Sequence, residues 1–464
     1  MNARYFRYIP LLLLVLSLDF SCKVVKPYQN PETGKINLYR DQNTADTNSI
    51  ATIPYQSFFT DTVLKNLINE GLSKNLNLKI AVQKIYEAQY QLNISKGALL
   101  PNVNGNVSAS RAKLPVVSLA PGTSDISNNY QIGISASWEA DIWGQLSSAK
   151  RSAYANLLQT DAAKRAIQTQ LIADIAANYY YLQALDQQLE ITQLAVQYRI
   201  KDVETMKALK EGAIVTGASV VQSEANRYSA EVAIPDIKRN IRETENAICL
   251  LLGRTPGPVN RLKLADEQVN IPLQTGLPAQ LLKNRPDIQQ AEYNFKAAFE
   301  NTNLAHTYFY PSFNITAAGG FSNISLKDFF VNSLFYNLAA GLTQPIFNQG
   351  INKSRLQTAE ARQLEALYSY QQTILTAGQE VSNALYAYQA SKDKDEARAK
   401  QIEALTKSVQ YTQELLKYSS ATNYIDVLTS EQSLLAARLS GINDKLQQLQ
   451  ATVNLYRALG GGWR

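Results

Sequence analysis

The sequence is poor in the residues that carry most enzyme chemistry. Among its 464 residues it has one histidine, His306, and two cysteines, Cys22 and Cys249. One histidine and two distant cysteines exclude the common zinc sites and a disulfide framework. The glycine-rich motifs that cradle nucleotide phosphates, G-x-x-x-x-G-K-[ST] and G-x-G-x-x-G after a strand, are also missing. We therefore predict no active site, no cofactor and no enzymatic activity, so that any energy for work must come from a partner.

Long hydrophobic runs are missing as well. The strongest candidate, IPLLLLVLSL near the N-terminus, is too short to span a bilayer as a helix. With Arg4 and Arg7 before it, this run is typical of a signal peptide over residues 1–21. It ends in DFSC, so Cys22 resembles the lipidated first residue of a mature bacterial lipoprotein, although Asp19 stands where an aliphatic residue is usual. The alternative is an ordinary secretory signal with an incidental cysteine.

A strong charge of either sign is also absent. The formal net charge is +6, and no run of Lys and Arg is long enough to indicate nucleic-acid binding. We therefore expect no nucleic-acid partner.

The chain repeats itself once. The stretch NLNLKIAVQKIYEA at 75–88 aligns with RPDIQQAEYNFKAA at 285–298, and the same shift aligns Pro101 with Pro311. Such a repeat predicts two halves with one layout, joined by a linker rich in turn formers. The expected parts are a signal peptide (1–21), a lipidated N-terminal segment (22–59), a first repeat (60–255), a linker (256–276) and a second repeat (277–460).

Each half contains one very long predicted helix. No proline interrupts the chain from Trp143 to about Glu211, or from about Asn352 to Tyr418. Apolar residues in the first of these segments recur at spacings of three, four and seven, as in coiled coils. At 1.5 Å per residue such a helix extends about 100 Å, and so polar a helix is stable only against neighbours. A shorter helix of roughly 30 residues is expected before the strands of each half.

Four segments alternate between apolar and polar residues with a period of two. In the first, NVNGNVSAS from Asn102 to Ser110, Val and Ala lie on one side and Asn and Ser on the other. The others are YQIGISASWEAD, SFNITAAGGFS and YNLAAGLTQ. Their length and alternation are typical of strands in a membrane β-barrel with a wet lumen. The alternative is a half-buried sheet in a soluble domain, which needs other apolar elements to cover it.

Four strands cannot close a barrel, and open edges in lipid leave backbone groups unpaired at several kcal/mol each. Closure therefore requires further copies of the chain, and about twelve strands from three copies leave room for water inside. Aromatic residues near the strand ends, including Phe335 and Tyr336, fit interfacial girdles. The residues expected to face the lumen are Asn102, Asn104, Asn106, Ser135, Asn314, Thr316 and Asn337.

Several motifs resemble one family. SWEADIWGQLSSAKRSA, NAICLLLGRTPG, LPAQLLKNRPDIQQAE, YPSFNITAAGGF, LTQPIFNQG and NYIDVLTSEQSLLAA look like the TolC-like outer-membrane efflux proteins. They are most similar to the lipoprotein branch that serves resistance-nodulation-division (RND) pumps, over roughly residues 55–460. The resemblance implies an α+β membrane protein with two structural repeats. Four strands per chain would contribute to a trimeric 12-stranded outer-membrane β-barrel, continued by a long α-helical coiled-coil tunnel in the periplasm.

The resemblance also implies partners and a place in the cell. It implies a homotrimer in the bacterial outer membrane, anchored by lipid at Cys22 and extending into the periplasm. A periplasmic adaptor (membrane fusion) protein and an inner-membrane RND-type pump would deliver drugs, metals or other small solutes, which the channel conducts passively to the exterior. One alternative is the outer-membrane duct of a type I protein secretion system. Another is a lipid-anchored periplasmic coiled-coil structural protein with no pore.

In this family an apolar ring and an acidic ring close the tunnel where the long helices turn. The turns here are EGAIVTGASVVQ at 211–222 and YSSATNYIDVLTSEQ at 418–432. The apolar position falls on Ile425, whereas the acidic position falls on Thr429, which carries no charge. The residues expected to form the periplasmic gate are Ile425, Asp426, Thr429 and Gln222.

Overall fold

The computed structural model describes residues 24–31, 49–113, 115, 125–267, 284–418 and 424–463. The predicted signal peptide, Cys22 and part of the second predicted turn lie outside the described residues. The chain folds into two compact units, each built from three separate stretches of sequence. Unit 1 comprises Met1–Glu32, Ile85–Thr160 and Ala291–Tyr370, and unit 2 comprises Thr33–Lys84, Asp161–Gln290 and Gln371–Arg464.

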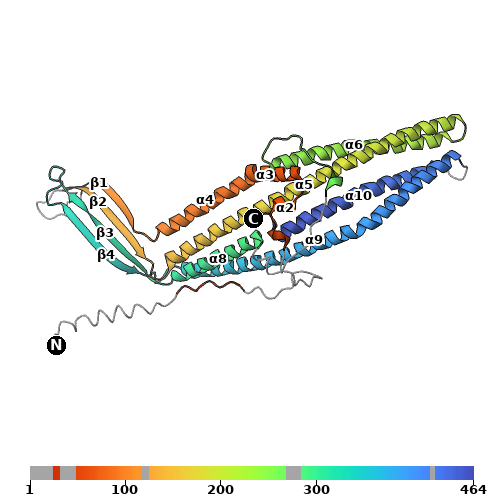
Figure 1. Ribbon diagram of the computed structural model, residues 1–464. Coiled ribbons are helices and arrows are strands. Elements are labelled where there is room, and N and C mark those ends of the chain that lie inside the picture. The colour runs from red at the N-terminus through yellow and green to blue at the C-terminus, as the bar shows by residue number, and fades with distance from the viewer. Residues whose placement is uncertain are drawn as a thin grey trace. The chain divides into compact units, whose positions relative to one another are not determined.

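The order of one helix, two strands and two long helices occurs twice along the chain (Figure 1). The first half contains η1 (Ile50–Thr52), α2 (Tyr55–Phe58), α3 (Thr62–Lys74), α4 (Leu76–Gly97), β1 (Asn102–Lys113), β2 (Ile126–Ala140), α5 (Gln145–Glu211) and α6 (Gly217–Leu251). The second half contains η3 (Leu264–Asp266), α8 (Pro286–Thr307), β3 (Ser312–Asn323), β4 (Leu334–Thr343), α9 (Ile351–Tyr418) and α10 (Tyr424–Ala458). The repeated order runs from α4 to α6 and from α8 to α10.

The two very long helices confirm the prediction from sequence. α5 has 67 residues and α9 has 68, and both end at the predicted residues, Glu211 and Tyr418. The other helices of the two repeats also match in length, since α4 and α8 each have 22 residues and α6 and α10 each have 35. No described helix combines the length with the apolar character that a membrane-spanning helix requires.

The prediction of one helix of roughly 30 residues before the first strand pair is wrong, because the helix is interrupted at Asn75. Asn75 leaves the helical conformation with φ −55° and ψ 128°. Its side-chain Nδ2 donates to the carbonyl oxygen of Leu251 at 2.8 Å, and its Oδ1 accepts from the backbone N–H of Leu78 at 3.0 Å. An asparagine that satisfies backbone groups on both sides ends one helix and starts the next, α3 and α4. The apolar spacing runs through this break and therefore hid it.

Unit 1 contains a four-stranded antiparallel sheet in the order β1-β2-β3-β4 (Figure 1). The four predicted segments are confirmed as strands, although β2 begins at Ile126 rather than at Tyr130. Within the residues that the structure describes, β1 and β4 each pair with a neighbour on one side only. The sheet of one chain therefore has two open edges.

Helices α5 and α6 of unit 2 run antiparallel to each other, as do α9 and α10 (Figure 1). Ion pairs join each couple: Lys207 Nζ of α5 lies 3.0 Å from Glu224 Oε1 of α6, and Arg398 Nε of α9 lies 2.8 Å from Asp444 Oδ2 of α10. The buried stripe of α5 includes Leu182, which is completely shielded from solvent. This stripe is the apolar seam that the spacing in the sequence predicts.

Candidate functional site

The sheet of unit 1 has one polar face. Directly opposed residues on neighbouring strands point to the same side of a sheet. The register places Asn104 opposite Ser135, Ser135 opposite Ala318, and Ala318 opposite Asn337. All the residues predicted to line a lumen therefore share this face: Asn102, Asn104, Asn106, Ser135, Asn314, Thr316 and Asn337.

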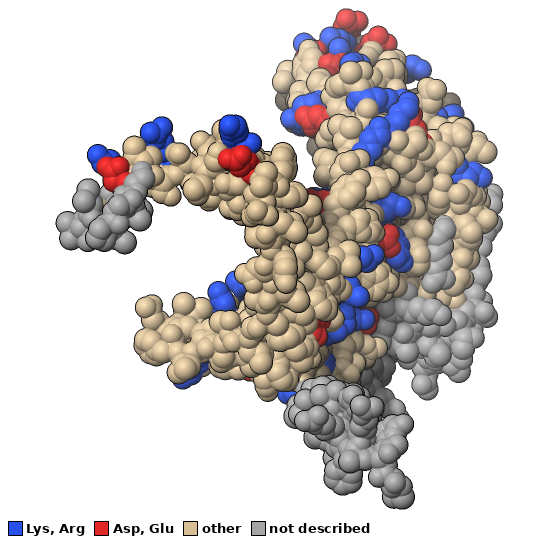
Figure 2. All heavy atoms as spheres, turned by 90° about the vertical axis from the view of Figure 1, so that its left-hand side faces the viewer, with Lys and Arg blue, Asp and Glu red and all other residues tan. Residues whose placement is uncertain are grey.

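The opposite face of the sheet is apolar and exposed. Gly105 lies opposite Ile134, Ile134 opposite Gly319, and Gly319 opposite Tyr336, so that the apolar residues also form continuous rows. Tyr336 is 88% exposed and Leu338 is 74% exposed. The strands of unit 1 face the viewer in Figure 2. A contiguous apolar patch of this kind marks a surface that contacts lipid or protein.

Phe335 departs from the predicted girdle, because it lies on the polar face. It pairs with Gly320, and its ring approaches within 3.5 Å of the place where a Cβ on Gly133 would stand. An aromatic ring over two glycines fills the space that their missing side chains leave on the sheet. The alternation already contains this information, since Tyr336 and Leu338 on the apolar face require Phe335 to point the other way.

The chain just after the predicted lipid site is docked on α8 in unit 1. The backbone N–H of Lys26 donates to Asn303 Oδ1 at 3.1 Å, and Asn303 Nδ2 donates to the carbonyl oxygen of Lys26 at 3.0 Å. The ring of Tyr28 packs edge-on against Phe299, with centroids 5.5 Å apart. Asn303 thus holds the backbone as a neighbouring strand would, only a few residues after Cys22.

The second predicted site lies where the long helices of unit 2 end. A buried apolar cluster holds this end together, and it joins Tyr424, Val427 and Leu428 of α10 to Met206 of α5 and Val220 of α6. The spacing of the α10 residues, i, i+3 and i+4, is that of one helix face. This spacing was present in the sequence and could have identified the buried face of α10.

The four predicted gate residues lie outside that cluster, on exposed surfaces. Ile425 is 67% exposed, and the Thr429 hydroxyl donates to the Ile425 carbonyl oxygen at 2.8 Å. Asp426 lies between them on the first turns of α10, and its carbonyl accepts from a serine hydroxyl at 2.9 Å. Gln222 belongs to α6, where its Nε2 lies 3.5 Å from Asn226 Oδ1. The structure therefore groups Ile425, Asp426 and Thr429 on α10 and keeps Gln222 on another helix.

Polar contacts between the helices surround the apolar cluster, and sequence reasoning missed them. The hydroxyls of Tyr424 and Ser223 lie 2.9 Å apart, and Arg199 donates to the carbonyl oxygen of Asn226. Gln432 Nε2 lies 3.4 Å from Asn226 Oδ1. Burial raises the pKa of Tyr424 to about 12, so its hydroxyl keeps its proton at physiological pH. These contacts tie α10 to α6 and α6 to α5.

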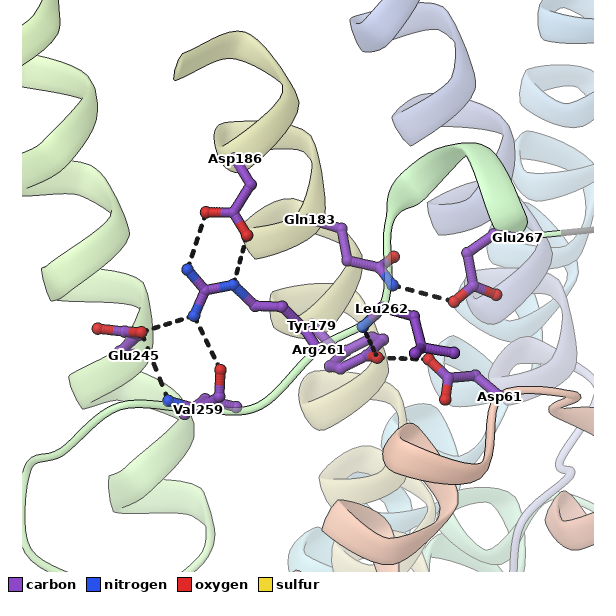
Figure 3. Close-up of polar contacts among 9 residues, drawn as sticks. All are labelled: Asp61, Tyr179, Gln183, Asp186, Glu245, Val259, Arg261, Leu262 and Glu267. Carbon is purple, nitrogen blue, oxygen red and sulfur yellow. Dashed lines mark hydrogen bonds and ion pairs between the residues drawn. The ribbon is translucent and has the colours of Figure 1, made fainter. Parts of the chain in front are cut away.

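Unit 2 contains a further polar network that includes none of the predicted site residues (Figure 3). Arg261, which follows α6, donates through Nε and Nη2 to the carboxylate of Asp186 at 2.5 and 2.8 Å. Its Nη1 donates to Glu245 Oε1 at 2.6 Å and to the Val259 carbonyl oxygen at 2.8 Å. One guanidinium therefore joins α5, α6 and the connection between the repeats, in the bidentate geometry that arginine favours.

Beside Arg261 a second part of the network is buried more deeply (Figure 3). Tyr179 donates to Asp61, which caps α3, and accepts from the backbone N–H of Leu262 at 3.1 Å. Gln183 Nε2 donates to Glu267 Oε1 at 3.0 Å. Burial, together with the nearby carboxyl of Asp61, raises the pKa of Glu267 to about 7 against the lowering effect of the hydrogen bond from Gln183. Among the described residues, no group of three or more His, Cys, Asp or Glu is placed to hold a metal ion.

Known proteins share both the sequence and the fold. The family model described as outer membrane efflux protein matches residues 67–254 and 277–461. The chain is 29% identical to the cation efflux system protein CusC of Escherichia coli O6:H1 (strain CFT073), over 96% of each chain. It is 28% identical to the probable outer membrane lipoprotein SilC of Salmonella typhimurium, over 97% of this chain and 98% of SilC. It is 30% identical to the solvent efflux pump outer membrane protein SrpC of Pseudomonas putida, over 95% and 96%.

A solved structure gives the same result for the fold. A crystal structure of CusC superimposes with a TM-score of 0.85 at 27% identity, and the match covers 95% of this chain and all of that one.

Proposed function

Because the chain belongs to the outer membrane efflux protein family, we propose that it is the exit channel of a tripartite efflux system. Its fold is TolC-like and its place is the outer membrane, as for its relatives. In this proposal an inner-membrane RND-type pump and a periplasmic adaptor deliver solute, and the channel conducts it passively outward without catalysis.

The observation that carries the proposal is the register of the sheet. It separates a face that carries amides and hydroxyls from a face of apolar residues and glycine over all four strands, with Phe335 as an aromatic residue on the polar face. A strand that is apolar on one side and wet on the other fits a barrel with lipid outside and water inside. Because β1 and β4 are both edges within the described chain, lipid requires another copy to pair with each of them. Three copies would supply about twelve strands, which leaves an aqueous bore.

The helices of unit 1 supply a second argument for a homotrimer. On α4 the side chains of Tyr86, Tyr90 and Ile94 follow one helix face and are 53%, 64% and 64% exposed. On α9 Leu364 and Tyr368 are 51% and 62% exposed. Apolar rows of this kind are stable in water only when another helix covers them. We assign both rows to contacts between protomers.

The proposal gives roles to the predicted lipid site and to the predicted gate residues. Cys22 carries the lipid, and the two hydrogen bonds between the Asn303 side chain and the Lys26 backbone hold the segment that follows it against α8. At the periplasmic end, Ile425 supplies an apolar ring and Thr429 a polar one, with Asp426 as the adjacent carboxylate.

The names of the related proteins indicate what kinds of cargo such channels carry. CusC is named for cation efflux and SrpC for solvent efflux, so similar channels serve pumps with very different cargo. The amide and hydroxyl groups on the polar face of this sheet suit a wide, unselective bore. We propose that the pump, and not this channel, selects the small solutes that leave.

The proposal is tested with the mature protein purified from outer membranes. Its mass in detergent, measured by light scattering, should be that of three copies, and its addition to a planar lipid bilayer should produce discrete ion conductance. A monomer that leaves the bilayer insulating would overturn the proposal and favour a coiled-coil spacer without a pore.

A further inference from the structure

Two carboxyl groups face each other near the predicted gate. Asp202 of α5 lies within hydrogen-bonding reach of Glu431 of α10, although both are acidic. The Oδ2 atom of Asp202 is buried and has no donor among the described side chains. A hydrogen bond between two carboxyl groups exists only when one of them carries a proton. The geometry therefore leaves one buried oxygen that a single proton would satisfy.

Within the part of the chain that the structure describes, no second positive charge is in contact with this pair. Arg199, one turn earlier on α5, attracts Asp202 but already donates to α6. From α9 the neighbour is the neutral amide of Gln413, whose Nε2 donates to Glu431 Oε1 at 2.9 Å. From α10 the phenol of Tyr424 faces both carboxyl groups and stays neutral.

The remaining titratable groups nearby are paired elsewhere or line the cavity beside Glu431. On α6, Glu224 is paired with Lys207 of α5 at 3.0 Å. Arg438 of α10 and Tyr198 of α5 line the same cavity of about 300 Å³ as Glu431. Arg199 is the one positive charge that acts on Asp202 among the described residues, and a proton on the pair would remove the repulsion from Glu431. Burial is the main cause that raises the pKa of Asp202 to about 7, followed by the charge of Glu431.

We propose that Asp202 and Glu431 form a proton-dependent tie between α5 and α10 that controls the periplasmic gate. While the pair shares one proton, the protonated carboxyl donates to the other and α10 stays against α5. When the proton leaves for bulk water, two negative charges face each other beside one positive charge, and α10 separates from α5. Alkaline conditions should therefore open the tip and acidic conditions close it. The inference rests on the proposed channel function, since it concerns the regulation of that gate.

The test is the conductance of the purified trimer in planar bilayers as a function of pH. If the closed form binds the proton one pKa unit more tightly than the open form, the open-to-closed ratio rises about tenfold between about pH 5.5 and about pH 8.5. Asp202→Asn and Glu431→Gln keep a donor between the helices without a titrating proton, so both should remain in the low-conductance form at every pH. Glu403→Gln, an exposed site on α9, should keep the wild-type profile.

Two results would overturn the inference while leaving the channel function intact. One is wild-type conductance that does not change with pH, and the other is an unchanged pH profile in both Asp202→Asn and Glu431→Gln. Loss of all conductance in the wild-type trimer would contradict the proposed function instead. In that case the pair is still tested by infrared spectroscopy. The difference between the infrared spectra of wild-type and Asp202→Asn trimers should contain a protonated-carboxyl band that disappears near neutral pH. Absence of this band at acidic pH would overturn the inference.

Discussion

The hydroxyl groups of Tyr424 and Ser223 meet at 2.9 Å, which fastens the first turn of α10 to the first turns of α6. Ser223 is 1% exposed and Tyr424 is 7% exposed, so water cannot replace this bond when it is lost. The apolar cluster around Met206 lies directly beside it. The contact therefore adds a directional bond to a packed end of the helices.

Removal of this bond should loosen the tip. Tyr424→Phe keeps the ring in the apolar cluster but leaves the Ser223 hydroxyl without its partner, at a cost of about 1–2 kcal/mol. If the bond is made only in the closed form, the open-to-closed ratio in planar bilayers should rise roughly 5- to 30-fold. Tyr411→Phe, on an exposed part of α9, is the matched control and should conduct as the wild type does. Equal conductance of the two variants would show that the bond has no part in gating.

Arg261 should be a principal stabilising residue of unit 2. It bonds to Asp186, Glu245 and the backbone, and its side chain is only 17% exposed. Arg261→Ala leaves two partly buried carboxylates without their positive partner, so we expect a loss of about 2–4 kcal/mol per protomer, measured by denaturant unfolding.

Arg239 provides the control for Arg261. It pairs with Asp236 at 3.5 Å, but both side chains are more than 60% exposed at 64% and 67%. Exposed pairs contribute little, so Arg239→Ala should change stability by less than about 1 kcal/mol. A similar loss in both variants would mean that the Arg261 network is no stronger than an ordinary surface pair.

The buried carboxyl of Glu267 should make stability depend on pH. Its pKa is raised from 4.5 to about 7, so the folded protein binds this proton more tightly than the unfolded chain does. The contribution is therefore complete below about pH 4.5, is lost as the pH rises to about 7, and is of the order of 1–3 kcal/mol per protomer. Glu267→Gln should flatten this part of the curve of unfolding temperature against pH.

Two comparisons make the Glu267 experiment specific. Glu243→Gln, at an exposed position of α6, should leave the pH dependence as in the wild type. The slope that remains in Glu267→Gln belongs to the other carboxyls whose pKa burial raises, Asp202, Asp174 and Glu292. A wild-type protein whose stability increases between pH 4.5 and pH 7 would contradict the assigned protonation of Glu267.

The lipid anchor can be tested with the two cysteines of the chain. Cys22→Ser should abolish the incorporation of labelled palmitate in growing cells, because no other thiol lies at the mature N-terminus. Cys249→Ser removes the buried cysteine of α6 and should leave the label in place. A wild-type protein that takes up no palmitate would favour the alternative of an ordinary secretory signal, and palmitate retained in Cys22→Ser would mean that the lipid is attached elsewhere.

Periodicity predicted the elements of this fold well, because each pattern is local. The extents of α5 and α9 follow from the absence of proline within each helix. The opposite faces of Asn104 and Val103 follow from the alternation along one strand. The break at Asn75 was missed because its cause is a bond to Leu251, which is 176 residues away. A local pattern contains no information about such a partner.

The site was predicted less completely than the fold for the same reason. Ile425 and Thr429 were placed by resemblance, and their shared exposed face agrees with a helix spacing of four. The tie between Tyr424 and Ser223 joins residues 201 positions apart, and the Asp202–Glu431 pair joins two helices from different repeats. Only the packed structure brings these groups together.

The most direct test of the channel is the environment of alternate residues along the strands. In a Cys249→Ser background, spin labels are attached at single cysteines placed on the two faces, and collision with oxygen or with a water-soluble nickel chelate is measured in membranes. We predict that labels at Val103, Ile134 and Leu338 collide mainly with oxygen, as in lipid, and that labels at Asn104, Ser135 and Asn337 collide mainly with the chelate. Labels on both faces that report the same environment would contradict a sheet with lipid on one side and water on the other.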